Sequence, residues 1–378
     1  MADNISIKGW CPGAWRPMPS GDGLLVRVRP ERAMLDRNQV LALCEASETF
    51  GNGIIHLTNR ANLQLRGVKE KHWRPLLDML MGAGLVDSDP AREGQRNLLL
   101  APDWGAGDVT DRLARQLLER LSELPSLPAK VGFAIDAGRN PILAGDSADF
   151  RIERGLTGEL IVRADGHATG TVAHSERGAV DLIIRLARWF MATGGADSGR
   201  MSRHSQPLPP WAQAQVAPST PRRPLSLGDH ALGAVYGLTF GQVEAAALRD
   251  AVGPEYVTGI RVTPWRRLLV EGAEVRPLPG LLDNDDAPQL RVDACPGAPH
   301  CEQATVATRE LANSLSRHVA GRLHVSGCSK GCARRQPADV CVVGDSGRYQ
   351  LIFQGRADGI ADVTDLTESQ VLTYFGVN

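Results

Sequence analysis

The sequence lacks an excess of charge of either sign, because 42 Lys and Arg residues almost balance 43 Asp and Glu residues, leaving a formal net charge of −1. Such a balance creates no general attraction for nucleic acid or for an acidic membrane surface, so any basic site must be local. No stretch approaches the roughly 18 apolar residues of a membrane span. The opening letters MADNISIKGWCPGAW also contain no apolar segment of the signal-peptide type. We therefore expect a cytoplasmic protein with neither nucleic-acid nor membrane partners.

Neither the size nor the composition is unusual for a globular protein. The chain has 378 residues, of which 43% are hydrophobic and 22% charged, enough for two or three domains with sizeable cores. In a reducing cytoplasm a group of cysteines indicates a metal site or catalysis before it indicates disulfides. The seven cysteines are therefore candidates for chemistry.

The two halves of the chain resemble each other. ADFRIERGLTGELIVRADG (148–166) aligns with ADVCVVGDSGRYQLIFQGRADG (338–359), and IIHLTNRANLQLRG (54–67) aligns with GIRVTPWRRLLVEG (259–272). The order of features is the same in both halves, and the repeat distance is far too long for a solenoid. Chance similarity between amphipathic segments is the alternative, but a duplicated domain pair with pseudo-two-fold symmetry explains the pattern better.

Each half mixes short β-branched runs with helical patterns. GLLVRVRP (23–30) is typical of a strand, and apolar residues at helical spacing predict helices within 109–124 and 303–319. The Pro-rich segment at 205–229 predicts an extended connector between the halves. This alternation favours an α+β fold with layered sheets and helices rather than a helix bundle.

Four cysteines near the C-terminus form two pairs, C-x5-C and C-x3-C. They are Cys295 and Cys301, then Cys328 and Cys332. Zinc sites favour tighter pairs of the C-x2–4-C type, and C-x5-C is too wide for them. An iron–sulfur cluster accepts wider spacing because each thiolate binds a different iron atom. Spacing alone favours a cluster, while a zinc site or unrelated buried cysteines remain open.

Small residues accompany the second pair. Gly327 and Gly331 flank Cys328 and would let the backbone come close to a cluster and donate N–H groups to it. The other cysteines lie in ordinary surroundings. Cys44 and Cys341 occur in apolar patterns typical of a core, and Cys11 is either a buried thiol or a residue near the pocket.

The segments CPGAPHC, GCSKGC and ADVCVVG together resemble the cluster-binding half of the sulfite and nitrite reductase superfamily. The first half is similar to the same superfamily in LTNRANLQL (57–65), QRNLLLAP (95–102) and LPAKVGFAID (127–136). This resemblance covers nearly the whole chain, including its duplication. It implies a [4Fe–4S] cluster on the four cysteines, with the last cysteine also bridging to sirohaem iron in the reductases.

The resemblance also implies a domain organisation. Each half would consist of a ferredoxin-like α/β part followed by a second α+β part, and only the second half would carry the cluster. The expected boundaries are 1–85 and 86–204 for the first half, 205–229 for the connector, and 230–285 and 286–378 for the second half.

In the reductases, two Arg and two Lys side chains surround the anion that is reduced. Carried over to this chain, these positions fall on Arg60, Arg96 and Lys130, which become the candidate catalytic residues, while the second Lys position falls on Gly132. Each positioned cation stabilises the growing negative charge during reduction. The loss of one cation therefore disfavours sulfite or nitrite reduction.

The opening CPGAWRPMPSGDGLLVRVRP (11–30) and the segment HVSGCSKGCARRQPADV (324–340) resemble the precorrin-3B synthase branch of the superfamily. That resemblance implies O2-dependent hydroxylation of precorrin-3A and lactone formation in aerobic cobalamin biosynthesis. The alternatives are a sirohaem-dependent sulfite or nitrite reductase and a zinc-stapled tetrapyrrole carrier without a redox role.

Precorrin-3A carries a fringe of carboxylates, which Arg can pair bidentately. The candidate substrate-binding residues in the first half are Arg27, Arg29, Asn62, Gln64 and Arg66. Weaker candidates in the second half, for which an exposed strand-end charge is the competing explanation, are Arg266, Arg267, Arg334 and Arg335.

The expected reactants besides precorrin-3A are O2 and an external electron donor, either a reductase or a ferredoxin. The glycines of GNGIIH (51–56) and GAGDVT (105–110) do not complete G-x-G-x-x-G and predict turns, so no tight NAD(P)H or flavin site is expected. None of the nine histidines lies in a recognisable two-His-one-carboxylate pattern. A cluster with four thiolates has no obvious open iron and would pass single electrons, so sirohaem or an additional iron is the candidate for a further cofactor, and the atom that binds O2 is left open.

Overall fold

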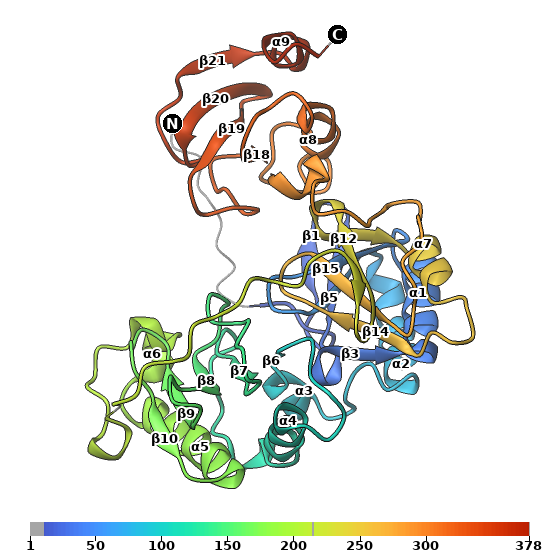
Figure 1. The fold of residues 1–378 in the computed structure, drawn as a ribbon. Helices are drawn as coiled ribbons and strands as arrows, with labels where there is room; N and C mark the ends of the chain where they lie inside the picture. The colour runs from blue at the N-terminus through green and yellow to red at the C-terminus, as the bar shows by residue number, and fades with distance from the viewer. Residues whose placement is uncertain (1–10, 214, 378) are drawn as a thin grey trace.

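The computed structural model describes residues 11–213 and 215–377. Its described part contains four β-sheets with helices packed against them (Figure 1). The α+β class predicted from the sequence is confirmed, and so is the arrangement of a ferredoxin-like sheet followed by a second α+β part in each half.

The first ferredoxin-like sheet has the strand order β1-β2-β5-β4-β13. The Asp36 side chain caps its main helix and accepts a hydrogen bond from the backbone N–H of Gln39, which forms a capping box. Buried Val40, Leu43 and Cys44 lie on the face that this helix turns toward the core. The elements from this half are β1 (Met18–Ser20), β2 (Gly23–Val28), α1 (Arg37–Phe50), β4 (Ile54–Leu57), β5 (Leu63–Val68) and α2 (Trp73–Gly82).

The second ferredoxin-like sheet repeats this plan, with the strand order β11-β12-β15-β14-β3 and a short extra strand, β16, beside β12. Its helix is only half as long as α1 and packs beside it. The elements are β11 (Gly228–His230), β12 (Gly233–Leu238), α7 (Ala245–Ala251), β14 (Gly259–Val262), β15 (Arg267–Glu271) and β16 (Leu281–Leu282).

The two ferredoxin-like sheets exchange strands with each other. β3 (Met34–Asp36) belongs to the first half but pairs with β14, and β13 (Gln242–Glu244) belongs to the second half but pairs with β4. A residue with positive φ precedes each exchanged strand, Arg32 at 54° and Phe240 at 55°. The sharp turn that carries each chain across therefore has the same backbone form in both halves.

The second part of the first half is a five-stranded sheet in the order β10-β9-β8-β7-β6, with α4 and α5 packed together over it. Asp108 caps α4 and Ser175 caps α5, each through a side-chain oxygen that accepts a backbone N–H. The elements are α3 (Pro90–Gln95), β6 (Leu98–Leu100), α4 (Val109–Glu119), β7 (Phe133–Asp136), β8 (Phe150–Arg154), β9 (Leu160–Ala164), β10 (Thr171–Ala173), α5 (Glu176–Ala192) and α6 (Gly195–Ser198).

The corresponding part of the second half forms a separate C-terminal lobe, residues 292–377, at the top of Figure 1. Its sheet has the order β17-β18-β19-β20-β21. The elements are β17 (Val292–Ala294), α8 (Arg309–Leu315), β18 (Leu323–Ser326), β19 (Ala338–Asp345), β20 (Arg348–Gly355), β21 (Val363–Leu366) and α9 (Glu368–Tyr374).

The topology confirms the duplication. In the β6–β10 sheet and in the β17–β21 sheet, the first three strands along the chain run parallel and the later ones antiparallel, in the same spatial order. The paired sequence segments fall on equivalent strands, β8 with β19 and β4 with β14. The helix predicted within 303–319 is shorter than expected. It covers only Arg309–Leu315, because the preceding residues form the loop that carries Cys301.

The connector between the halves is extended, as its composition predicts. Isolated β-bridges join Gly155 to Pro218 and Gly170 to Val216, so the connector lies along the first-half sheet. The guanidinium of Arg185 stacks on the ring of Trp211 at 4.0 Å. The connector is thus anchored to this sheet and to α5.

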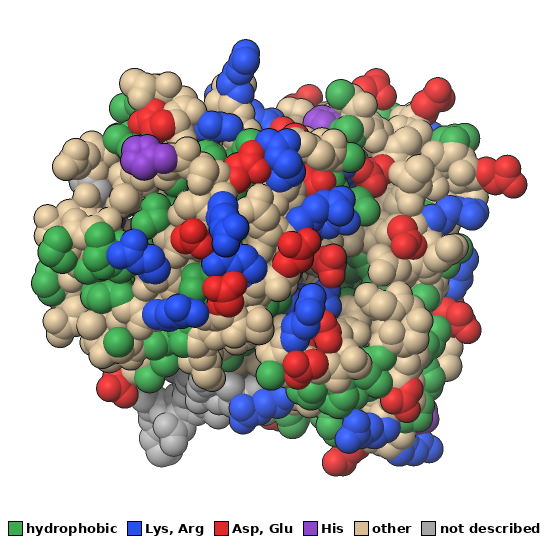
Figure 2. All heavy atoms as spheres, turned by 90° about the horizontal axis from the view of Figure 1, so that it is seen from below, with side chains coloured by type: hydrophobic (Ala, Val, Ile, Leu, Met, Phe, Trp, Pro, Cys, Tyr) green, Lys and Arg blue, Asp and Glu red, His purple; other side chains and the backbone are tan. Residues whose placement is uncertain are grey.

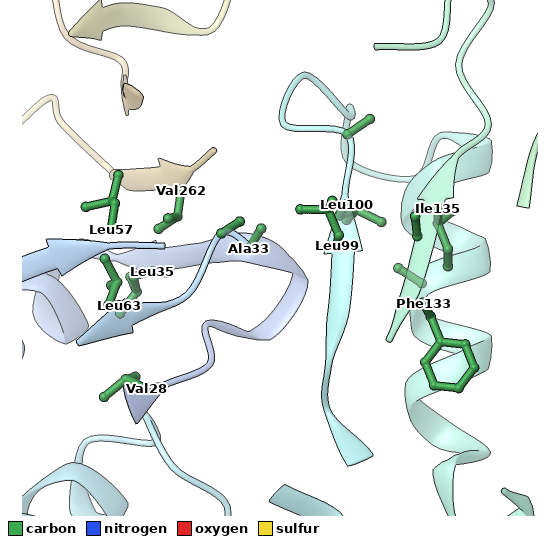
Figure 3. Close-up of a cluster of buried hydrophobic side chains, with 14 of the residues drawn as sticks. Val28, Ala33, Leu35, Leu57, Leu63, Leu99, Leu100, Phe133, Ile135 and Val262 are labelled. Carbon is green, nitrogen blue, oxygen red and sulfur yellow. The ribbon is translucent and has the colours of Figure 1, made fainter. Parts of the chain in front are cut away.

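One hydrophobic core unites the two ferredoxin-like sheets and the β6–β10 sheet, while the C-terminal lobe has separate apolar clusters. Figure 3 shows Leu57 of β4 close to Val262 of β14, with Leu99 and Leu100 of β6 between them and Ile135 of β7. The domain boundaries expected from the sequence stay predictions, since the shared core crosses three of them.

On the face drawn in Figure 2, basic and acidic side chains are intermixed. Within the described residues, every helix is too short or too polar to cross a lipid bilayer.

The strand exchange predicts one position where a methyl group is not tolerated. A Cβ at Gly259 would lie 2.2 Å from the backbone oxygen of Leu35, at the β3–β14 pairing. Gly259→Ala should lower the free energy of unfolding by about 1–3 kcal/mol, because two backbones must separate. Gly138→Ala, where a Cβ meets nothing within 4 Å, is the control for urea unfolding. Equal stability of the two variants would contradict a tight exchange.

Candidate functional site

A central cavity of about 870 Å³ lies where the two ferredoxin-like sheets meet the C-terminal lobe. The first half contributes β2, β4, β5 and the β4–β5 turn, and the second half contributes the symmetry-related β14–β15 turn. The C-terminal lobe contributes the segments around Cys295 and Cys332. A second cavity of about 540 Å³, beside β13 and α7, has neither a cysteine nor an arginine among its described lining residues. The central cavity is therefore the candidate site.

The central cavity is rich in arginine. Its described lining includes a single acidic side chain, that of Asp293. An excess of guanidinium groups of this kind suits a ligand that carries several carboxylates. Seven arginines line the cavity: Arg27, Arg66, Arg266, Arg267, Arg309, Arg322 and Arg334.

Several buried polar atoms at the cavity wall lack a hydrogen-bond partner among the described residues. They are Nε of Arg27, Nε2 of His56 and Nε of Arg309. Buried polar groups are normally paired. Three unpaired nitrogens among the lining residues fit a site that binds a polar ligand.

The four predicted cluster cysteines come together at the edge of the cavity. Cys295 is buried, Cys301 and Cys328 are half-buried, and Cys332 is the most exposed of the four. Burial raises the pKa of the Cys328 thiol, and the nearby thiols of Cys295 and Cys301 raise it further. Burial and the same neighbours raise the pKa of Cys332, although its side chain keeps exposed surface that faces the cavity. All four thiols thus lie within electrostatic range of one another.

This donor set fits an iron–sulfur cluster. The backbone N–H of Gly327 donates to Sγ of Cys295 at 3.2 Å, the kind of contact that stabilises thiolate ligands. Within residues 11–213 and 215–377, no group of three or more His, Cys, Asp or Glu side chains is arranged to hold a single metal ion. Four thiols within electrostatic range of one another are the soft ligand set that such a cluster takes.

Glycine is needed where the two cysteine loops meet. A Cβ at Gly327 would lie 2.5 Å from Cβ of Ala304 in the other loop. Gly331, next to Cys332, has φ of +59°, which favours glycine. The glycine at 327 thus allows the two cysteine loops to lie close together, while the approach of the backbone to a cluster stays a prediction.

The loop that carries Cys301 rests on the first half of the chain. Arg66 of β5 donates to the carbonyl oxygen of His300 at 3.0 Å and to Asp22 at 3.1 Å, and Ser20 also donates to the His300 carbonyl, at 3.1 Å. A Cβ at Gly21 would lie only 2.7 Å from the Pro299 carbonyl oxygen. The β1–β2 turn therefore fixes this cysteine loop against the ferredoxin-like sheet.

His56 lies on the cavity wall beside Arg309, with Nη2 of Arg309 3.5 Å from Nδ1 of the imidazole. Burial, reinforced by the positive charges of Arg309 and Arg66, lowers the pKa of His56 to about 3. Burial, reinforced by repulsion from Arg66, also lowers the pKa of Arg309 to about 10. His56 is therefore a neutral hydrogen-bonding group at physiological pH.

The predicted residues Arg29 and Arg96 form a buried triad with Glu93. Nη1 of Arg29 lies 3.1 Å from one carboxylate oxygen, and Nη1 of Arg96 lies 3.1 Å from the other. Arg96 also donates to the backbone oxygen of Arg29 at 2.9 Å. The shared carboxylate offsets one of their two charges and holds both side chains within the first half, and neither residue is part of the cavity lining.

Arg60 differs from Arg29 and Arg96 in that its buried guanidinium has no carboxylate partner among the described residues. Its guanidinium has neither a hydrogen bond nor an ion pair with the described residues, and burial together with repulsion from Arg200 lowers its pKa. It belongs to a group with Arg27 and Cys11, in which the Cys11 thiol interacts with Arg27. This group lies next to the cavity through Arg27, which is part of both.

Three further positions differ in their surroundings. Lys130 is exposed. Asn62 is buried and its Nδ2 has no partner among the described residues. A Cβ at Gly132 would lie 2.7 Å from Nδ2 of Asn97, so a side chain at the position that carries the second Lys in the reductases would have to displace the Asn97 amide.

The structure thus brings Arg27, Gln64 and Arg66 together with Cys295 and Cys332 in one cavity. Of the weaker candidates, Arg266, Arg267 and Arg334 join them, and the exposed Arg335 does not. Arg29, Arg60, Asn62, Arg96 and Lys130 lie outside this lining, and their roles stay predictions. Four cavity residues were not predicted as site residues from the sequence: His56, Asp293, Arg309 and Arg322. The only sequence signals that could have indicated them are the strand register and the spacing from the cysteines.

The pKa of His56 predicts a loss of stability in acid. Since the folded pKa is about 3 and the unfolded value about 6.5, the unfolded chain binds a proton first as the pH falls. Stability is therefore present above about pH 6.5 and declines below it. Between pH 7 and pH 5, urea unfolding of the wild type should lose about 2 kcal/mol more than that of His56→Gln. The exposed His318→Gln is the control, and a His56→Gln variant as acid-sensitive as the wild type would contradict the burial of a neutral imidazole.

Comparison with known proteins places these features in one family. Residues 16–83 match the model of the nitrite/sulfite reductase ferredoxin-like half domain. The structure resembles that of Mycobacterium tuberculosis NirA over 93% of this chain and 79% of that one, with a TM-score of 0.58 and 18% identity, which supports the fold. A ferredoxin–nitrite reductase of Synechococcus elongatus is 23% identical over 89% of this chain and 78% of its own length.

A precorrin-3B synthase of Sinorhizobium is 31% identical, over 93% of this chain and 84% of its own length. A match over this share of the chain extends into both halves of the duplication. The chain therefore belongs to the precorrin-3B synthase family, within the nitrite and sulfite reductase superfamily.

Proposed function

We propose that this enzyme converts precorrin-3A to precorrin-3B with O2, by hydroxylation at a meso carbon and closure of a lactone by a neighbouring acetate. One oxygen atom of O2 enters the product and the other leaves as water, which requires two electrons and two protons from outside the substrate. The observation that carries this proposal is the central cavity, where seven arginines meet two of the four cysteines.

The arginines would bind the acetate and propionate groups around the macrocycle. Arg27 and Arg66 would act from the first half, and Arg267, Arg309 and Arg322 from the second. Guanidinium groups pair carboxylates bidentately and so fix the orientation of a flat ligand as well as its charge. The neutral His56 and Gln64 would add hydrogen bonds without adding charge.

Cys295, Cys301, Cys328 and Cys332 would hold a [4Fe–4S] cluster, which supplies single electrons when bound. The cavity lies directly beside two of these ligands, Cys295 and Cys332, so a bound macrocycle would sit within short reach of the electron source. Lys330 would place a positive charge near this loop. We assign the supply of electrons to a separate reductase or ferredoxin.

Arg60, Arg96 and Lys130 would act electrostatically on the oxygen-bearing side of the ligand, as the corresponding cations do on the anion in the reductases. Arg60 is the best placed of the three, because its guanidinium has no carboxylate partner among the described residues and it belongs to a group that includes the cavity residue Arg27. Arg96 would act mainly by holding Arg29 and Glu93 in place. Lys130, which is exposed, would have to reach inward on ligand binding.

Sirohaem-dependent reduction of sulfite or nitrite is the second candidate, favoured by the similarity to the nitrite reductase of Synechococcus elongatus. Gly132 argues against it, because one of the cations needed to stabilise growing negative charge is absent. Absorption separates the two: a reductase purifies with sirohaem bands, whereas the proposed enzyme shows the broad iron–sulfur shoulder.

The full chain, purified anaerobically, tests the proposal. Iron and sulfide in a four-iron ratio are expected, where one zinc per chain would support a carrier instead. Incubation with precorrin-3A, O2 and a chemical reductant should yield a product one oxygen atom heavier by mass spectrometry, with the label from ¹⁸O2. An unchanged substrate mass with a fully loaded cluster would overturn the proposed reaction.

The role of the cysteines is tested by Cys328→Ser. Loss of one thiolate should remove most of the bound iron and sulfide and destabilise the C-terminal lobe, because ligand binding and folding are coupled. Cys11→Ser changes a thiol near Arg27, outside the quartet, and should keep the full iron content. A Cys328→Ser protein with wild-type iron, sulfide and absorption would show that this residue is not a ligand.

A further inference from the structure

Asp293 lies at the centre of a charged group that connects the cavity to the cysteine loops. It is part of β17, is 5% exposed, and precedes Cys295 by two residues. Its carboxylate forms ion pairs with Arg266, with Arg322 at 3.7 Å and with Arg334 at 3.4 Å. All three arginines line the central cavity.

The three arginines come from segments far apart in the sequence. Arg266 belongs to the β14–β15 turn, Arg322 directly precedes β18, and Arg334 follows Cys332 in the second cysteine loop. Asp293 lies beside them because β17 pairs with β18 in parallel register, which sets Asp293 next to His324. One carboxylate therefore joins a ferredoxin-like sheet, the lobe's own sheet and the loop of a cluster ligand.

Each guanidinium is also held by a backbone carbonyl. Arg266 donates to the Val292 oxygen at 2.9 Å, and Arg322 donates to the Leu290 oxygen at 2.9 Å. Arg334 donates to the Pro337 oxygen at 3.0 Å. These second contacts leave further N–H groups of each planar fork available, since a guanidinium has five donors.

The charges do not cancel within the group. Three positive side chains share one negative partner, so two positive charges remain. Burial lowers the pKa of Arg322; Asp293 opposes this shift, and repulsion from Arg334 and Arg266 adds to it. Without the carboxylate the three guanidiniums would repel one another and separate.

We propose that Asp293 is a positioning residue that gathers Arg266, Arg322 and Arg334 into one binding site for carboxylate side chains of the tetrapyrrole. The inference rests on the proposed function and extends it by assigning part of the ligand's acidic fringe to this wall. The site would hold the macrocycle beside Cys295 and Cys332, because Asp293 lies in β17 two residues before Cys295, and Arg334 follows Cys332 by two residues in the second cysteine loop.

Two explanations of Asp293 predict opposite changes in ligand affinity for Asp293→Asn. In one only the net charge of the cavity matters, and in the other Asp293 positions the guanidiniums. Removal of a negative charge from an anion-binding cavity should tighten binding if only net charge matters. If Asp293 instead holds the guanidiniums in place, the variant should bind a polycarboxylate more weakly, because correct geometry is lost and the ligand must reassemble the site. The direction of the change therefore decides between the two.

The test uses the full chain with its cluster loaded and uroporphyrin, a porphyrin with acetate and propionate side chains, as the probe. Fluorescence titration at fixed ionic strength should show at least about tenfold weaker binding for Asp293→Asn, the size of one lost charge-assisted contact. Asp293→Glu should recover much of the affinity. Asp365→Asn makes the same charge change at an exposed site of the same lobe and should bind as the wild type does.

The outcomes separate this inference from the proposed function. Equal or tighter binding by Asp293→Asn, with iron content and unfolding temperature like the wild type, overturns the positioning role. A wild-type protein that does not bind uroporphyrin or precorrin-3A overturns the proposed function itself.

If Asp293→Asn does not fold, Arg322→Gln and Arg334→Gln take its place. Both should weaken binding, whereas Arg335→Gln, at the exposed neighbour outside the cavity, should not. Equal affinities for the three arginine variants would overturn the inference.

Discussion

The exchange of β3 and β13 between the two ferredoxin-like sheets is the constraint on which the site depends. Each sheet is completed by a strand from the other half, so neither can move or turn without breaking backbone hydrogen bonds. Equivalent β-turns, β4–β5 and β14–β15, consequently meet at the same cavity from opposite sides. Duplication has produced two walls of one site, and the sequences of these walls have since diverged, with Arg60 in one turn where Trp265 stands in the other.

The distribution of acids decides which arginines remain available to a ligand. Glu93 is shared by Arg29 and Arg96 and keeps both within the first half. Asp22 pairs with Arg66 at the edge of the cavity, and Asp293 is shared among three arginines at the wall nearest the cysteines. A buried carboxylate with one cation neutralises it, whereas a carboxylate shared by several cations leaves positive charge in place and holds it in a fixed geometry. The cavity thus keeps an excess of positive charge in a protein whose net charge is almost zero.

The same contacts connect substrate binding with the cluster. The β1–β2 turn and Arg66 hold the His300 carbonyl and with it the loop of Cys301. Asp293 in β17 lies two residues before Cys295, and its partner Arg334 lies in the loop of Cys332. The C-terminal lobe has its own hydrophobic clusters, and these polar contacts, together with Phe240, which packs against the lobe's cluster, join it to the rest. Their place at the cavity means that a bound ligand would add to the forces that hold the lobe.

The sequence by itself determined the features that local spacing or repetition encodes. The α+β class, the duplication, the four-cysteine quartet, the need for glycine beside it and the buried positions of Cys44 and Cys341 all follow from residues close together or from one half aligned with the other. Membership of the superfamily followed from the same short segments. These inferences held because chemistry at fixed spacing and side-chain periodicity do not depend on distant partners.

Only the tertiary structure decided which charged residues face the cavity. Arg27 and Arg29 are two residues apart and look equivalent in the sequence, yet Arg29 is captured by Glu93 and Arg27 lines the cavity. Arg266, Arg322 and Arg334 share Asp293 only because a sheet register and a β-turn bring four distant positions together. The physical reason is that the role of a guanidinium depends on the nearest carboxylate, and that distance is fixed by the packing of segments remote in the chain.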